Sequence, residues 1–281
     1  METLMHRYQQ NPFVVADIDY QPGDNLNSFA DTNAMLRYSD QFNQPLIHFW
    51  RLTDTIILGM MDTKLPYFKT ALTTLAKKDY HYFVRNSGGL AVASDAGILN
   101  VSLFLPHFKD QGIDVAYNQM VKWVKDSFAS PDYPIEAYEI TRSYCPGTFD
   151  LSIHGQKFGG ISQRRVAGGV AVMLYLSVNG DQDYRSNALK AFYTRGLAGA
   201  TTKWHFPDID PKVMANLDSL LQRSLTVAQV KSALLTNFEA NGLLSTTKRF
   251  ADIAQEPEYQ LYFERAHQQL VQRNQRDLPT H

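Results

Sequence analysis

Cysteine is the scarcest residue type in this sequence, with one copy in 281 residues. A lone thiol cannot form an internal disulfide or build a cysteine-rich zinc site, and its scarcity fits a reducing compartment. Residues 1–10 carry no apolar stretch behind a basic start, which is not the pattern of a secretory signal. No segment approaches the about 20 consecutive apolar residues that a membrane-spanning helix needs. We therefore expect a cytoplasmic protein without a membrane partner.

An excess of charge of one sign is also missing. Lys and Arg total 27 against 28 Asp and Glu, a formal net charge of -1. Because the chain has no global basic field, we expect no nucleic-acid partner. We expect no metal site either, because His48, His81 and His154 have no partner at ligand spacing. Hydrophobic residues at 44% and aromatic residues at 12% indicate a globular chain with a sizeable core.

Short apolar runs alternate with amphipathic stretches over the first two hundred residues. The runs at 46–52 and 55–60 predict a hairpin or two adjacent strands. Apolar residues three and four apart predict one helix from Leu65 onward and another over 114–128. Further strands are expected at 82–84, 98–105, 135–140, 148–154, 158–164 and 170–178. This mixture of elements predicts an α/β core.

The C-terminal third has a different pattern. From about Pro207 the strand signal stops, and Thr226 to Gln229 resembles a capping box that opens a helix running through Leu235. Pro257 predicts the start of a final helix, whose last dozen residues are polar enough to fray. We therefore expect a core domain over residues 1–205 and a small helical extension over residues 206–281 packed on it.

Two adjacent glycines, Gly88 and Gly89, follow the strand expected at 82–84 within the segment Arg85-Asn86-Ser87-Gly88-Gly89-Leu90. Glycine permits a positive φ and a close approach of the backbone to a ligand, with amide N–H groups free to donate. A tight turn between two strands is the commoner explanation of the same local pattern.

The single cysteine, Cys145, directly precedes Pro146-Gly147 in an expected loop. Such a position suits an exposed nucleophile, although a free cysteine is also a common buried filler. If residues 148–163 form a hairpin that turns at His154-Gly155, Lys157 lies opposite Ser152, roughly 20 Å from Cys145 along an extended chain. The loop must then fold back for Lys157 to reach the cysteine; otherwise Lys157 is a solvated strand-end lysine.

Together these motifs resemble the superfamily of lipoate-protein ligases, lipoyl(octanoyl)transferases and biotin ligases. The resemblance rests on Arg-x-Ser-Gly-Gly at 85–89, on Gly97-Ile98-Leu99-Asn100, and on Asp150 followed by Gly-x-Lys-x-x-Gly-x-Ser-x-Arg at 155–164. It covers roughly residues 25 to 200. The cysteine-containing stretch is most similar to the bacterial octanoyl-[glycine cleavage system H protein]:protein N-octanoyltransferases. The chain departs from ATP-dependent ligases at Asn86 and Ser94, where ligases commonly carry basic or aromatic residues.

This resemblance implies an α+β fold in which helices flank a central mixed sheet, like that of class II aminoacyl-tRNA synthetases and biotin ligases. It implies that residues 1–205 form the catalytic domain and that an apolar tunnel beside the glycine pair holds the acyl chain. Cys145 would be the acyl-thioester nucleophile, and Lys157 would lower its pKa and orient the acyl carbonyl. The remaining expected substrate-binding residues are Arg85, Ser87, Gly88, Gly89, Asn100, Asp150 and Gly160.

By resemblance, the enzyme would be an acyltransferase that needs neither ATP nor a metal. Its donor would be the octanoylated (or lipoylated) H protein of the glycine cleavage system, and its acceptor the lipoyl-domain lysine of 2-oxoacid dehydrogenase E2 subunits. Three alternatives stay open: transfer of octanoyl from acyl carrier protein, ATP-dependent lipoate ligation, and a non-enzymatic relative that only binds acylated carriers. Arg164-Arg165 are either solvated arginines or a docking point for an acidic carrier domain.

Overall fold

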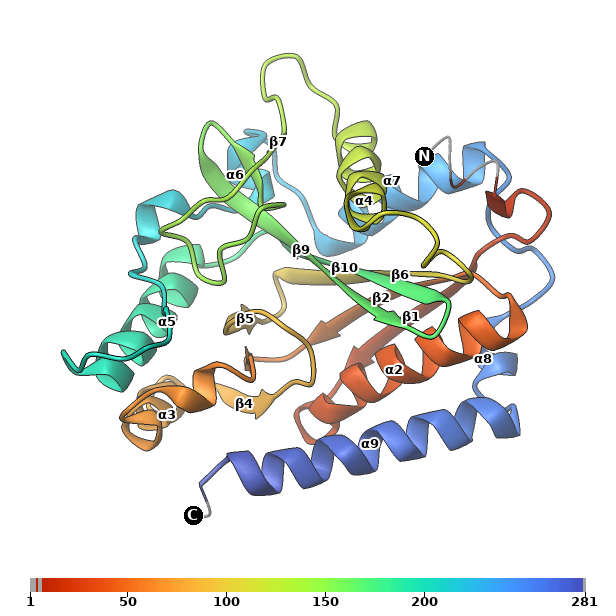
Figure 1. The fold of residues 1–281 in the computed structure, drawn as a ribbon. Helices are drawn as coiled ribbons and strands as arrows, with labels where there is room; N and C mark the ends of the chain where they lie inside the picture. Colours follow the sequence, from red (N-terminus) through yellow and green to blue (C-terminus); the bar gives the residue numbers. More distant parts are fainter. Residues whose placement is uncertain (1–3, 5–6, 280–281) are drawn as a thin grey trace.

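A seven-stranded mixed sheet forms the centre of the computed structural model, which describes residue 4 and residues 7–279 (Figure 1). Its strands lie in the order β1-β2-β6-β10-β9-β8-β7, with β1 and β2 parallel and the other neighbours antiparallel. The strands are β1 (Val14–Tyr20), β2 (Leu46–Leu52), β6 (Ile98–Leu105), β7 (Glu136–Ala137), β8 (Leu151–Ile153), β9 (Gln156–Val166) and β10 (Gly169–Ser177). The expected mixed sheet flanked by helices is confirmed.

A second sheet of three strands, in the order β4-β3-β5, lies beside the first. It consists of β3 (Thr55–Leu58), β4 (His81–Val84) and β5 (Val92–Ser94). The expected pairing of segments 46–52 and 55–60 is therefore wrong, because they belong to different sheets. Strand β2 is bonded to β1 on one edge and to β6 on the other, so it has no free edge for β3.

Helices cover both faces of the large sheet (Figure 1). On one face, α2 packs on the strands and α9 packs on α2; on the other, α4 packs on β9 and β10 and α7 packs on α4. The pair α3 and α5 packs together beside the small sheet. The α-helices are α2 (Asn25–Phe42), α3 (Phe68–Ala76), α4 (Ile113–Ser127), α5 (Gln182–Leu197), α6 (Leu217–Leu220), α7 (Val227–Ala240), α8 (Phe250–Ile253) and α9 (Pro257–Asp277). Short 3-10 helices occupy Pro22–Asp24, Asp62–Lys64 and Pro211–Val213.

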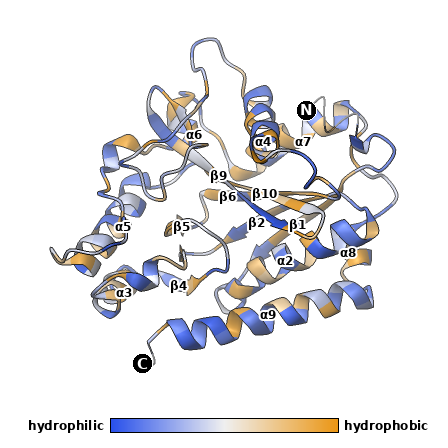
Figure 2. Ribbon diagram, viewed as in Figure 1, coloured by the Kyte–Doolittle hydropathy of each residue, from blue (hydrophilic) through white to orange (hydrophobic). Residues whose placement is uncertain are grey.

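After residue 205, the regular elements in the described part of the chain are all helices, as the sequence indicates. The capping box of Thr226 and Gln229 is confirmed, and it starts a helix that continues past Leu235 to Ala240. The expected fraying of the last dozen residues is wrong for most of them, because α9 continues to Asp277 and buries Leu270. Figure 2 shows α9 as a largely hydrophilic helix with scattered hydrophobic positions, as suits an outer layer. The domain boundary at residue 205 stays a prediction.

The hairpin of β8 and β9 has the register expected from its turn. Both His154 and Gly155 have a positive φ, 51° and 75°, and Ser152 lies opposite Lys157. Two predicted strands are shorter than their apolar runs: 135–140 gives only Glu136–Ala137, and 148–154 gives only Leu151–Ile153. The reason is Asp150, whose backbone closes a turn onto Gly147 and whose carboxylate accepts the N–H of Ile140.

Candidate active site

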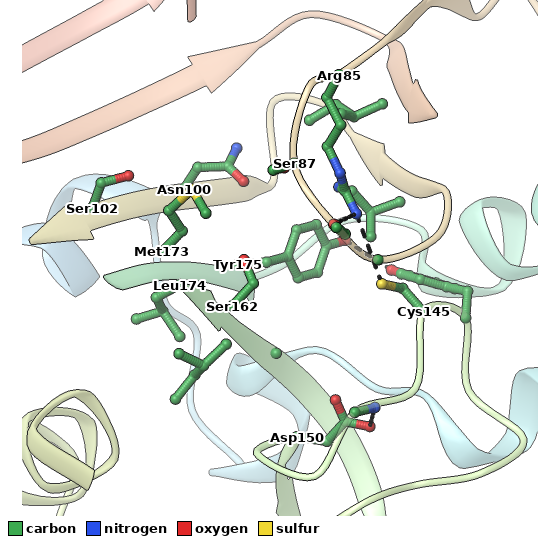
Figure 3. A pocket seen from close by; sticks show the side chains of 18 of the residues that line it. Arg85, Ser87, Asn100, Ser102, Cys145, Asp150, Ser162, Met173, Leu174 and Tyr175 are labelled. Atoms are coloured by element: carbon green, nitrogen blue, oxygen red, sulfur yellow. Dashed lines mark hydrogen bonds between the residues drawn. The ribbon is translucent and has the colours of Figure 1, made fainter. Parts of the chain in front are cut away.

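One pocket gathers three segments that are distant in the sequence (Figure 3). It has a volume of about 230 Å³ and lies between the loop after β4, the loop before β8 and the beginning of β9. Every residue that the sequence predicts to catalyse the reaction or bind substrate lines it. These residues are Arg85, Ser87, Gly88, Gly89, Asn100, Cys145, Asp150, Lys157 and Gly160. The folded chain thus brings together what the sequence separates by up to 75 positions, from Arg85 to Gly160.

The thiol of Cys145 lies against the glycine-pair loop. The backbone N–H of Leu90 donates to its Sγ at 3.2 Å, and Nη2 of Arg85 lies 4.0 Å from the same sulfur. Cys145 itself has a left-handed backbone conformation, with a φ of 47°. A non-glycine residue in this region costs free energy, and such residues gather at functional sites. The Leu90 N–H and the Arg85 guanidinium are thus the polar groups that contact the sulfur.

Arg85 holds this loop in shape. Its Nη2 donates to the carbonyls of Gly88 and Leu90, both at 2.9 Å, and Figure 3 shows the side chain pointing toward Cys145. Gly89 has a φ of 90°, and a Cβ added there would lie 2.5 Å from Nη2 of Arg85 and 3.1 Å from Sγ of Cys145. The second glycine is therefore required by both conformation and space.

Lys157 reaches the cysteine loop through its ammonium. Nζ lies 2.9 Å from Oδ1 of Asp150 and 2.9 Å from the carbonyl oxygen of Cys145, with further bonds to the Tyr144 carbonyl at 3.0 Å and the Ser143 hydroxyl at 3.1 Å. The loop folds back as the hairpin geometry requires. The ammonium meets the carbonyl of Cys145, whereas the contacts of its sulfur are Leu90 and Arg85.

Asp150 completes a buried ion pair with Lys157. The two side chains are 2% and 3% exposed, and the second oxygen of Asp150 accepts the N–H groups of Gly147 and Ile140 at 3.1 and 3.2 Å. Burial raises the pKa of the Asp150 carboxyl, and the Lys157 ammonium opposes that rise. The pair thus fixes both ends of the turn that carries Cys145.

Two further groups near the loop have structural partners. The guanidinium of Arg164 donates to Oδ1 of Asn86 at 3.0 Å, which ties β9 to the glycine-pair loop. Arg165 instead donates to the carbonyls of Gln111 and Gly112 at 3.0 and 3.1 Å. Neither arginine is simply a solvated side chain.

Asp62 is a residue that sequence reasoning missed. Its buried carboxylate accepts the N–H of Gly59 at 2.7 Å and the hydroxyl of Tyr193 at 2.8 Å, while that hydroxyl accepts the N–H of Ala91 at 3.0 Å. Burial raises the pKa of Asp62 to about 6. Gly59 in turn abuts the glycine-pair loop, since a Cβ there would lie 2.0 Å from the Gly89 carbonyl oxygen. The Gly59-to-Asp62 spacing of a tight turn is the only sequence signal for this support.

Within residue 4 and residues 7–279, no three His, Cys, Asp or Glu side chains come together in a way that could hold a metal ion. Over the same residues, no helix combines the length and the apolar character needed to cross a membrane. His48, considered above as a ligand, is fully buried, which lowers its pKa to about 3.

Comparison with known proteins identifies close relatives. A family model described as the lipoyl protein ligase A/B catalytic domain matches residues 24–239. The chain is 38% identical over 260 residues to the octanoyl-[GcvH]:protein N-octanoyltransferase of Oceanobacillus iheyensis, covering 92% of this chain and 91% of the relative. It is 42% identical over 207 residues to the lipoyl-[GcvH]:protein N-lipoyltransferase of Listeria monocytogenes, covering 73% and 74%. A solved lipoate-protein ligase A bound with ATP has the same fold, with a TM-score of 0.69, 18% identity and coverage of 92% and 94%.

Proposed function

The chain belongs to the lipoyl protein ligase A/B catalytic-domain family, and from this premise we propose that it is an octanoyl (or lipoyl) amidotransferase. The donor is the acylated H protein of the glycine cleavage system, and the acceptor is the lipoyl-domain lysine of 2-oxoacid dehydrogenase E2 subunits. The observation that carries the proposal is the environment of the lone cysteine. Its sulfur lies in the pocket against the Leu90 N–H and the Arg85 guanidinium.

In the first step, sulfur of Cys145 attacks the amide carbonyl of the acylated donor lysine. A carbon–sulfur bond forms, the carbon–nitrogen bond breaks, and the thiol proton ends on the leaving lysine amine. In the second step the acceptor amine attacks the thioester, the carbon–sulfur bond breaks, and a proton returns to sulfur. A thiolate is both a strong nucleophile and a good leaving group, so one difficult transfer becomes two easier ones.

The surrounding residues have separate tasks in this proposal. Arg85 supports the thiolate, because its guanidinium is the cation nearest to sulfur among the contacts of the described chain. Lys157 holds the Cys145 carbonyl, maintains the left-handed turn, and presents positive charge where the acyl carbonyl oxygen enters. Asp150 acts through Lys157 as a positioning residue.

No ATP is needed, because exchanging one lysine amide for another is close to thermoneutral. No metal is needed either, because the thiolate supplies the nucleophile. The pocket instead supplies apolar burial, worth about 0.8 kcal/mol for each methylene of the acyl chain. Its apolar wall includes Phe29, Trp50, Ile57 and Val92.

Intact-mass spectrometry tests the proposal. Incubation with octanoylated H protein should add one octanoyl mass to the enzyme, and hydroxylamine should remove it. Since Cys145 is the only cysteine, a thioester has one possible location, and Cys145→Ala should acquire no adduct. An adduct on that variant would contradict the assignment. Acylation by octanoyl-acyl carrier protein but not by octanoylated H protein would favour transfer from acyl carrier protein. Pyrophosphate release from lipoate and ATP would favour a lipoate ligase. Binding of acylated carriers without an adduct would favour a non-enzymatic relative.

A further inference from the structure

Three buried polar atoms without a partner gather behind the end of the pocket that is far from Cys145. In the described part of the chain, the Ser102 hydroxyl, the Trp50 indole Nε1 and the His48 Nδ1 have no hydrogen-bond partner. Ser102 and His48 are fully buried and Trp50 is 4% exposed. Each such group costs about 1–3 kcal/mol when it stays unpaired. Because Ser102 and Trp50 line the pocket, a bound molecule can pair them.

The sheet register places these residues side by side. Ser102 lies opposite His48, and Trp50 lies opposite Asn100 two residues along the same strand. The rings of His48 and Trp50 stack with centroids 6.1 Å apart. The unpaired atoms therefore belong to one patch on β2 and β6.

The same register relates this patch to the reacting end. Lys157 lies over Gly160 on β9, since a Cβ added at Gly160 would be 3.7 Å from its Nζ. From Gly160 the pairs run across the sheet to Tyr175 on β10 and then to Asn100 on β6. Figure 3 shows Ser102 and Cys145 at opposite sides of the pocket.

Two strand spacings of about 4.8 Å separate β9 from β6, a span of roughly 10 Å. An extended eight-carbon chain has seven bonds of about 1.5 Å and spans roughly 9 Å along its zigzag. A chain whose carbonyl lies at Lys157 therefore reaches β6 at Asn100, which pairs with Trp50 and lies two residues from Ser102. Its last three carbons, which form the dithiolane ring in a lipoyl group, then point toward the patch.

We propose that Ser102 and Trp50 form a subsite for the end of the acyl chain that favours the dithiolane of a lipoyl group over the methyl end of an octanoyl group. The Ser102 O–H and the Trp50 N–H are donors, and sulfur is a weak acceptor for either of them. A hydrocarbon end offers neither of them a partner. This inference deepens the proposed function and rests on it for the identity of the acyl chain.

Equilibrium binding tests the subsite without depending on turnover. Calorimetry on the full chain compares the N-methylamides of lipoic and octanoic acid as probes. We expect tighter binding of the lipoyl amide, and a fall in the ratio of the two affinities by about threefold or more in Ser102→Ala and in Trp50→Phe. The matched control is Ser162→Ala, which makes the same truncation on β9. Ser162 pairs with Met173 on β10, and Met173 pairs with Ser102 on β6, so the two serines lie two strands apart. The control should leave the ratio of the two affinities unchanged.

Equal affinities for the two amides in the native chain, or a ratio unaffected by both substitutions, would overturn the inference. Thermal melts of Ser102→Ala and Trp50→Phe establish that each variant is folded, and the two variants test the subsite independently. A different result would contradict the proposed function itself: no acyl adduct on Cys145 with any acylated carrier.

Discussion

Removing the charge of Asp150 tests whether the buried ion pair holds the active-site turn. Asp150 and Lys157 lie 2.9 Å apart with side chains 2% and 3% exposed. In Asp150→Asn the ammonium keeps three oxygen acceptors but loses its counter-ion. Removing one partner of a buried pair costs about 3–5 kcal/mol. Deprotonating a lysine of ordinary pKa at pH 7 costs about 5 kcal/mol. The variant can bury a neutral lysine at that cost, so its loss of folding free energy does not exceed about 5 kcal/mol. Since three acceptors remain, we expect the free energy of unfolding to fall by about 3 kcal/mol and Tm by roughly 6–12 °C.

Urea unfolding followed by far-UV circular dichroism measures this loss. The matched control is Asp126→Asn, which breaks the Lys122–Asp126 pair, also 2.9 Å long but with side chains 55% and 31% exposed. Its expected cost is below about 1 kcal/mol. The double variant Asp150→Leu with Lys157→Met should lose less than the sum of its single losses, because no unpaired charge stays buried. Equal small losses in Asp150→Asn and Asp126→Asn would refute the reasoning.

Three further predictions concern the support of the glycine-pair loop. Gly59→Ala places a Cβ 2.0 Å from the Gly89 carbonyl oxygen and should slow acylation of Cys145 at least about tenfold. A Cβ added at Gly23 meets no atom within 4 Å, so the control Gly23→Ala should keep the native rate. The single-turnover rate of acylation measures both effects. Because the pKa of Asp62 is about 6 when folded and 3.8 ordinarily, its contribution to stability is complete below pH 3.8 and is lost as the pH rises through 6. Urea titrations should therefore show native stability falling relative to Asp62→Asn by about 2 kcal/mol between pH 4 and pH 7.5; a constant difference would contradict this prediction. Asn274→Ala removes two hydrogen bonds to the Val84 backbone, of 2.7 and 3.0 Å, and should destabilise the chain by about 2 kcal/mol and accelerate amide exchange at Val84.

Local signals explain which parts of the fold the sequence predicts. The His154-Gly155 turn sets the register of its hairpin, and the Thr226 capping box sets the start of α7, because both depend on neighbouring residues alone. The glycine pair and the cysteine loop are recognisable for the same reason, and all the residues expected from them line one pocket.

Two helices give no such signal. The helix α2 buries Asp31 and Asn33 together with its apolar residues, and α5 buries Arg185 in the same way, so neither shows an apolar stripe with a 3.6-residue period. Two of these polar groups have partners distant in the sequence. Asp31 accepts the hydroxyl of Tyr259, for example, and Arg185 pairs with Asp95. Periodicity cannot indicate a helix whose polar side is buried by tertiary contacts.

The surroundings of the thiol are non-local as well. The hairpin register indicates that Lys157 can approach the cysteine loop, but not which atom of Cys145 it meets. That choice depends on the left-handed φ of Cys145, which turns its carbonyl toward Lys157 and its sulfur toward the loop of Arg85 and Leu90. The charge nearest to sulfur therefore comes from a residue 60 positions earlier in the chain.

The C-terminal helix takes part in this arrangement through the strand that precedes Arg85. Strand β4 is an edge of the three-stranded sheet, so its outer backbone groups lack a strand neighbour. The amide side chain of Asn274 on α9 accepts the Val84 N–H and donates to the Val84 carbonyl, as a neighbouring strand would. Arg85 follows directly and holds the loop against Cys145. Because this edge is covered by α9, loss of the helix should loosen the arginine that contacts the Cys145 sulfur, although no atom of α9 lines the pocket.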